Sequence, residues 1–130
     1  MAYNTPRSLL VFQSPLIDLK NTLNYTIFTP TEDFLIFSIV FNMVNLVGTQ
    51  GFPITINLGW TGPSYDDFLS NFSGLASVNN TFSYTNNGTP FNTGMVPVVP
   101  ASTPLVLKVS TADTIATTDT QVAYIFGFYA

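Results

Sequence analysis

One segment of this chain restricts its possible folds more than any other. Residues 34–46 are apolar except for Ser38, Asn42 and Asn45, and they are rich in β-branched and aromatic side chains, which favour a strand over a helix. The run of about 14 residues up to position 47 is shorter than the ~20 that a membrane-spanning helix needs. Strand side chains alternate between two faces, and here both faces are apolar. The segment is therefore expected to be a central strand of a sandwich, or a strand whose outer face another subunit covers.

Alternation along this strand divides its side chains into two sets. One face carries Phe37, Ile39 and Phe41, which we predict to lie in the core. The other face supplies the candidate interface or core strand, namely Phe34, Ile36, Val40 and Val44.

The other segments are typical of strands separated by clusters of Gly, Pro, Asn and Thr. The further expected strands are residues 8–12, 23–28, 52–60, 81–85, 95–99, 105–110 and 121–129. A tight turn at residues 48–51 predicts a hairpin between the long strand and the strand after it.

The last expected strand alternates Val122, Tyr124, Phe126 and Phe128 with mostly smaller or polar residues, which predicts an integral strand held by a buried aromatic face.

One short helix is expected after Ser64. This residue is a good N-cap, Asp66 and Asp67 fall in the first turn, and the apolar residues that follow have helical spacing. With about eight strands, the predicted fold class is all-β: an antiparallel β-sandwich, jelly-roll-like, with one short helix. The length of 130 residues predicts a single domain over residues 1–130.

The composition excludes several kinds of chemistry. The chain has no histidine and no cysteine, and its only bases are Arg7, Lys20 and Lys108. Imidazole acid–base catalysis, thiol chemistry and imidazole- or thiolate-bound metals therefore have no residue to use. We expect no enzyme activity, no catalytic residues, no cofactor and no metal. We also expect no pH switch between about pH 6 and 8, unless a carboxyl group is strongly perturbed.

Charge and hydropathy point to a covered surface. The chain is 46% hydrophobic and 15% aromatic but only 8% charged, with a net charge of −4. Small monomers use charge to stay in solution, so a partner, including copies of the chain itself, is expected to cover much of this surface. The alternative is a monomer with a neutral polar coat. No basic cluster is present to bind nucleic acid, the N-terminus has no secretory signal pattern, and no membrane association is expected.

Two acidic pairs are candidate sites. Asp66 and Asp67 could ligate calcium, but the spacing of a calcium loop is absent, and charge at a helix N-terminus explains the pair. Glu32 and Asp33 could form the carboxylate pair of a glycosidase. Acids that flank an apolar strand also protect it from aggregation, and we favour this role.

Aromatic side chains offer a different function. Trp60, Tyr65, Tyr84 and Tyr124 could stack on sugar rings, because such side chains combine a flat apolar face with a polar edge. Trp60 follows the inward alternation of its strand and is expected in the core. Tyr65 and Tyr84 remain as candidate glycan-stacking residues.

The second half of the chain resembles a known family. Residues 54–59 (ITINLG) are followed by YDDFL at 65–69, and residues 104–112 (PLVLKVSTA) lead through a Thr-rich loop to VAYIFGFY at 122–129. This order resembles small β-sandwich structural proteins of tailed bacteriophages, in which a strand ending in Gly precedes an Asp-x-x-Leu turn and the last strand reads Val-x-Val-x-Gly-Tyr. The chain departs from that pattern in having Phe128 directly after Gly127.

The resemblance implies a virion structural protein, of the capsid decoration, head-fibre or tail accessory type. Its partners would be itself, as a homo-oligomer and most often a trimer, and other virion proteins. Its location would be the virion, assembled in the host cytoplasm, and no catalytic residues carry over. The alternative function is a carbohydrate-binding β-sandwich module for adhesion to host-surface glycans, and an enzyme comes third. A lattice or trimer would favour the structural role, whereas an exposed aromatic platform would favour sugar binding.

Overall fold

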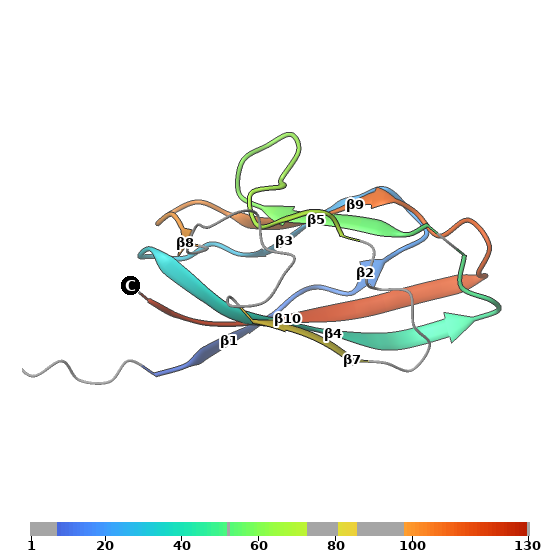
Figure 1. The fold of residues 1–130 in the computed structure, drawn as a ribbon, viewed down its shortest axis with the longest axis horizontal. Helices are drawn as coiled ribbons and strands as arrows, with labels where there is room; N and C mark the ends of the chain where they lie inside the picture. The colour runs from blue at the N-terminus through green and yellow to red at the C-terminus, as the bar shows by residue number, and fades with distance from the viewer. Residues whose placement is uncertain (1–7, 52, 73–80, 86–97, 130) are drawn as a thin grey trace, which may run out of the picture.

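The computed structural model describes residues 8–51, 53–72, 81–85 and 98–129, and these residues form two packed antiparallel sheets (Figure 1). The strands are β1 (Leu10–Gln13), β2 (Ile17–Asp18), β3 (Asn24–Phe28), β4 (Phe34–Val47), β5 (Thr55–Gly59), β6 (Leu69–Phe72), β7 (Thr81–Thr85), β8 (Val98–Val99), β9 (Leu105–Thr111) and β10 (Thr118–Tyr129). The all-β antiparallel sandwich predicted from the sequence is confirmed.

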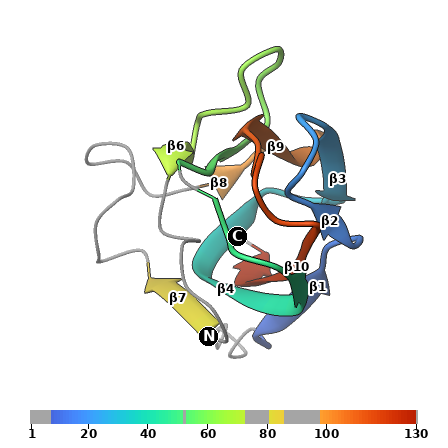
Figure 2. The same cartoon turned by 90° about the vertical axis from the view of Figure 1, so that its right-hand side faces the viewer.

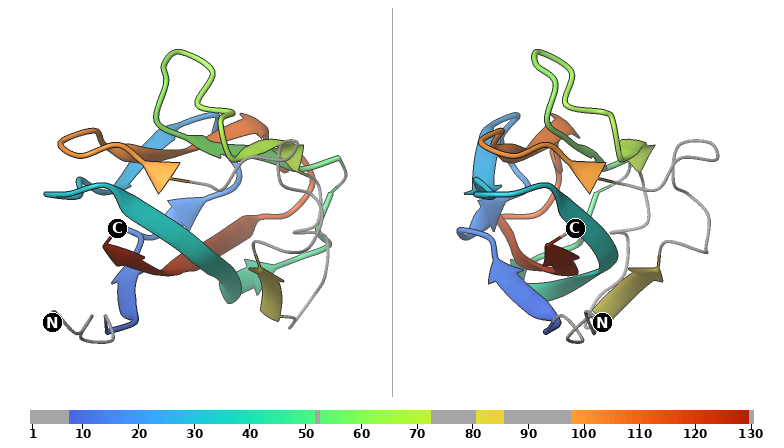
Figure 3. Two further views of the ribbon diagram at one scale, coloured as in Figure 1. Left: turned by 60° about the vertical axis from the view of Figure 1, so that its left-hand side comes forward. Right: turned by 90° about the vertical axis from the view of Figure 1, so that its left-hand side faces the viewer.

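The two sheets have simple strand orders. The first sheet runs β1-β10-β4-β7, with β2 also paired to β10 and β8 paired to β4, and the second runs β3-β9-β5-β6. Seen from the end, β1 and β3 lie on one side of the sandwich, and β6 and β7 lie on the other (Figure 2). Figure 3 shows how β4 twists across the first sheet so that its first residues meet β8.

The β4–β10 pairing is the longest in the described part of the chain, and two β-bulges interrupt it, at Phe37 and at Val44. Ile36 pairs with Gly127 and Ser38 pairs with Phe126, so Phe37 is the extra residue on β4. A bulge places two residues opposite one and reverses the alternation of faces beyond it. Side chains before and after Phe37 therefore cannot follow one continuous period of two.

The bulge at Phe37 corrects the predicted faces of β4. Phe34 and Ile36 point into the core before the bulge, and Ile39 and Phe41 do so after it. Phe37, which was predicted to be core, is 43% exposed on the outer side of the sheet. The prediction failed because it carried one strict alternation through the whole strand.

The final strand is integral to its sheet, as predicted, but its faces are reversed. β10 lies between β1 and β4, and its inward residues are Ala123, Ile125 and Gly127. The aromatic residues Phe126 and Phe128 are only half-buried, on the outer side. Where β10 passes Phe34, its inward position is a glycine, because there is no room for a side chain. A Cβ added to Gly127 would lie 2.6 Å from the Phe34 ring and closer still to the carbonyl oxygen of Leu35.

The core lies between the sheets and consists mainly of apolar side chains. At one end an aromatic group joins the sheets: the Phe12 ring of β1 stacks on Phe28 of β3 at 3.9 Å, and both rings meet the edge of Phe34. The remaining large buried side chains come mainly from the second sheet and its connections, and include Leu19, Ile54, Ile56, Leu58, Phe68, Leu69, Leu105, Leu107 and Val109.

Two further expectations were wrong. β4 and β5 do not form a hairpin, because β4 belongs to the first sheet and β5 to the second. No helix forms in the described part of the chain after Ser64, and thus none there that is long and apolar enough to cross a bilayer. Tyr65 adopts a φ of 50°, outside the helical region, and Leu69 pairs with Leu58 of β5. Strand pairing therefore overrides the helical spacing of the apolar residues.

The two phenylalanines of β4 give a matched test of this register. Phe41→Ala removes a ring that is 1% exposed, so it should lower the free energy of unfolding by about 3–5 kcal/mol. Phe37→Ala removes a ring that is 43% exposed and should cost about 1 kcal/mol or less. Urea denaturation of both variants checks this. Equal losses would contradict the bulge at Phe37.

Candidate functional site

The four residues of the candidate interface or core strand separate into two environments. Phe34 and Ile36 are fully buried between the sheets, whereas Val40 is half-buried and Val44 is 55% exposed on the outer side. The structure therefore assigns the first pair to the core. Only the second pair is accessible to another molecule.

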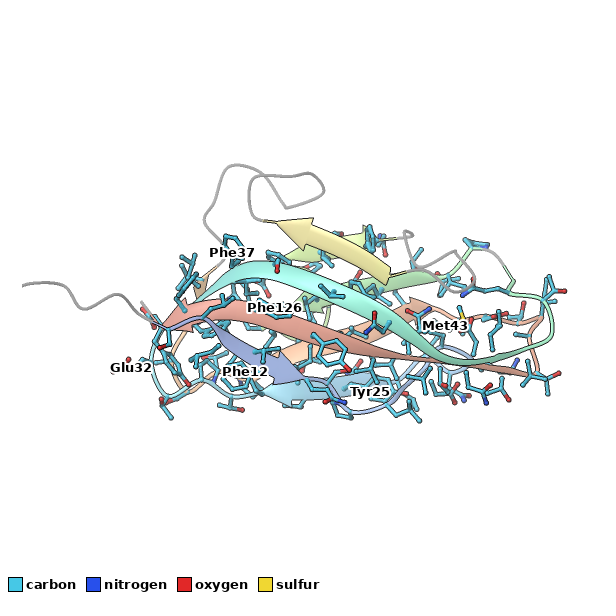
Figure 4. The ribbon with its side chains drawn as sticks, turned by 90° about the horizontal axis from the view of Figure 1, so that it is seen from below. Phe12, Tyr25, Glu32, Phe37, Met43 and Phe126 are labelled. Atoms are coloured by element: carbon cyan, nitrogen blue, oxygen red, sulfur yellow. The ribbon has the colours of Figure 1, made fainter. Side chains whose placement is uncertain are left out.

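The outer face of the first sheet carries a set of apolar side chains that the sequence analysis did not group. Val11 of β1 is opposite Phe126 of β10, and Leu35 of β4 is opposite Phe128. The Phe37 ring meets the Phe128 ring edge-on at 6.1 Å. We call this set the outer patch; its members are Val11, Leu35, Phe37, Val40, Phe126 and Phe128. Figure 4 looks onto this face, with Phe37 and Phe126 near one end and Met43 towards the other.

The outer patch has no charge around it on its own strands. β1 and β4 contain no charged residue, and the only one in β10, Asp119, is fully buried. Val11 is 54% exposed and Phe37 is 43% exposed, so a considerable apolar area faces water. Contiguous exposed apolar surface of this kind marks interaction sites in proteins.

The candidate glycan-stacking residues lie on different sheets. Tyr65 is half-buried in the loop between β5 and β6, which projects from the second sheet (Figure 1). Tyr84 belongs to β7, an edge strand of the first sheet on the opposite side of the molecule, and its side chain lies outside the described residues. Trp60 packs against the core, and Tyr124 is half-buried on the outer side of β10. Sugar binding stays a prediction.

Asp67 organises the start of the projecting loop. Its Oδ2 atom accepts hydrogen bonds from the backbone N–H groups of Trp60 at 2.7 Å and Thr61 at 2.8 Å. Its neighbour Asp66 is exposed. The expected charge at a helix N-terminus is therefore wrong, because no helix forms in this described segment; Asp67 instead caps the start of a loop.

Glu32 and Asp33 are exposed in the connection before β4. Asp33 accepts a hydrogen bond from the backbone N–H of Ala101 at 2.9 Å. Among the described residues, no three acids, histidines or cysteines cluster closely enough to hold a metal ion.

Sequence reasoning missed a buried acidic pair. Asp113 lies in the connection between β9 and β10, Asp119 is the second residue of β10, and they are 1% and 0% exposed. Asp113 Oδ1 accepts hydrogen bonds from the backbone N–H groups of Ile115, Ala116 and Gly51, at 2.9, 3.1 and 3.0 Å. The Asp-x-x-Ala sequence at 113–116 was the available signal, since an aspartate often accepts from amides two and three residues on.

The pair has shifted ionisation. Burial, a hydrogen bond with the Asp113 carboxyl and the charges of Asp113 and Asp18 together raise the pKa of Asp119 to about 6, against the lowering effect of Gln50. Burial also acts to raise the pKa of Asp113, but its hydrogen bonds with Asp119 and the three amides bring the net pKa below its usual value. Two acids whose environments separate their pKa values in this way are a coupled pair.

Comparisons with known proteins give a fold relationship. No family model matches the chain, and no curated protein matches it. The chain is similar in structure to one described as the cyanophage Pam1 capsid asymmetric unit. The TM-score is 0.63 at 14% sequence identity, and the match covers 100% of this chain and 91% of that chain. At this identity, the similarity is one of fold.

Asp66 and Asp67 provide a test of capping against calcium binding. Asp67→Ala leaves two backbone N–H groups without their acceptor and should lower the free energy of unfolding by about 1–2 kcal/mol. Asp66→Ala should cost less. Urea denaturation with and without a chelator is the measurement. A midpoint that moves on chelation would overturn the capping interpretation.

Proposed function

We propose that this protein is a virion structural subunit, a single-domain component of a bacteriophage particle that acts by assembly and not by catalysis. The observation that carries the proposal is the fold similarity to a phage capsid chain along the full length of this chain. The sequence resemblance to β-sandwich proteins of tailed phages supports the same role. A capsid decoration, head-fibre or tail accessory subunit is the specific form we propose.

Assembly requires a surface that gains from being covered, and the outer patch has this property. Its exposed members are apolar, and the strands that carry them place no charged side chain on the surface. Burying such a surface needs no desolvation of ions and gains about 25 cal/mol per Å² of apolar area. The net charge of −4 is carried elsewhere, so two copies can meet here without direct repulsion.

The proposed partners are further copies of this chain, with a trimer as the expected stoichiometry, and other proteins of the particle. The proposed location is the virion, after assembly in the host cytoplasm. Light scattering of the purified chain, together with electron microscopy of concentrated samples for regular assemblies, tests self-association. A monodisperse monomer at micromolar concentration would contradict it.

A charge placed in the outer patch gives the sharper test. Phe37→Asp puts a carboxylate on a side chain that is 43% exposed, so the fold should persist while self-association is lost. Leu23→Asp is the matched control, because Leu23 is 51% exposed and lies outside the patch. Light scattering should give a monomer mass for the first variant and an oligomer mass for the second. An oligomer that survives Phe37→Asp would exclude the outer patch as the interface.

A further inference from the structure

Three connections between the sheets meet at one end of the sandwich, on the right in Figure 1. They are residues 19–23 between β2 and β3, 48–54 between β4 and β5, and 112–117 between β9 and β10. Backbone hydrogen bonds join them: Asp113 N–H donates to Leu19 O at 2.7 Å, and Thr117 N–H donates to Val47 O at 2.8 Å. This end is therefore one structural unit made from distant parts of the chain.

Polar side chains hold this unit together from inside. Asp113 Oδ1 accepts from Gly51, in the β4–β5 connection, and from two amides of its own connection. Gln50 Nε2, beside Gly51, donates to Asp119 Oδ2 at 3.0 Å. The Lys20 ammonium donates to the carbonyl oxygens of Asp113 and Ala116. Each connection thus contributes to the cluster around the two acids.

One carboxyl oxygen of each acid receives none of these hydrogen bonds. Asp113 Oδ2 and Asp119 Oδ1 are buried and accept no hydrogen bond from an N–H or hydroxyl group in the described part of the chain. The two carboxyl groups are nevertheless hydrogen-bonded to each other. Two ionised carboxylates have no hydrogen to share, so this contact requires a proton on one of them.

We infer that Asp113 and Asp119 share one proton and act as a pH-dependent clasp, which holds the three connections together while the proton is bound and loosens when it leaves. Asp113 stays ionised as the acceptor of three amides, and Asp119 carries the proton. Release of that proton to solvent leaves two adjacent buried carboxylates without a donor between them. Their repulsion and desolvation then oppose the closed arrangement.

The charges around the clasp are few. Asp18, at the end of β2, acts on Asp119 and adds to the raising of its pKa. Lys20, from the β2–β3 connection, is the nearby base and binds backbone carbonyls of the 112–117 connection. The β4–β5 connection, residues 48–54, has no charged residue and contributes the neutral Gln50.

The direction of the pH effect follows from proton binding. Asp119 has a pKa of about 6 in the folded chain and an ordinary lower value when unfolded, so the folded state binds more protons between about pH 4 and 6. Stability from Asp119 is therefore complete at about pH 4 and falls as the pH rises through 6. Asp113 acts in the opposite sense, since its pKa is lowered, and its contribution is lost below about pH 4.

Thermal denaturation between pH 4.5 and 8 tests the clasp. The wild-type melting temperature should fall by several degrees up to about pH 7 and then level off. Asp119→Asn keeps a hydrogen-bond donor towards Asp113 but cannot ionise, so its melting temperature should be nearly constant over the same range. Asp67→Asn is the control, because Asp67 caps a different loop, and this variant should keep the wild-type slope. A flat wild-type profile, or an unchanged slope in Asp119→Asn, would overturn the proposal.

A second measurement on the unmodified chain does not depend on the variant folding. Carbon-13 NMR should show one aspartate carboxyl titrating near pH 6 and a coupled one with its pKa lowered from its usual value. Amide hydrogen exchange at Gly51, Ile115 and Ala116, corrected for intrinsic rates, should lose up to about tenfold protection per pH unit between about pH 4 and 6 and then level off. All carboxyls titrating near pH 4 would contradict a shared proton.

Discussion

The pairing of β4 with β10 is the interaction on which the rest of the structure depends. These are the two longest strands, and every other strand of the first sheet attaches to one of them. Their register holds because Gly127 leaves room for the Phe34 ring and the Leu35 carbonyl, a space that any side chain would fill. The bulge beside this contact then directs Phe34 and Ile36 inward on one side of Phe37, and Ile39 and Phe41 inward on the other. The bulge at Phe37 thus determines both which side chains of β4 enter the core and which face the outer patch.

The strands were predictable from the sequence, but their arrangement was not. Period-two alternation and Gly, Pro and Asn clusters depend on nearby residues, so most strands were expected within a few residues of their observed bounds. The exposure of Phe37 depends on the partner strand, which contributes Gly127 ninety residues later. The predicted β4–β5 hairpin and the predicted helix after Ser64 were wrong for a related reason. β5 pairs with β9 and not with β4, and the segment after Ser64 ends in β6, which pairs with β5. Local preference is outweighed where a strand partner is available.

The candidate sites show the same limit. Val40 and Val44 were identified as interface candidates from their own strand, yet the outer patch also needs Val11 and Phe126 from two other strands. Asp113 and Asp119 gave no combined signal, because each is a single acid beside a Thr-rich connection. The β9–β10 connection brings the two acids together in space, and Gln50 and Gly51 of the β4–β5 connection donate hydrogen bonds to them. Residue types alone show that the chain has no imidazole or thiol group. The outer patch and the buried acidic pair could be recognised only from the pairing of distant segments in space.

The absence of histidine does not remove the means to respond to pH near 6. Imidazole titrates there without perturbation, whereas a carboxyl needs burial and a second carboxylate to reach that range. Both conditions are met at Asp119, which is fully buried and adjacent to an Asp113 that three amides hold ionised. Together with the hydrogen bond from Asp119, the amides lower the pKa of Asp113 and so decide which acid gives up its proton first. The outer patch lies on strands that expose no charged side chain. The buried acids lie at the other end of the β4–β10 pair, where the connections cross between the sheets, and this is where we propose that the charge changes with pH.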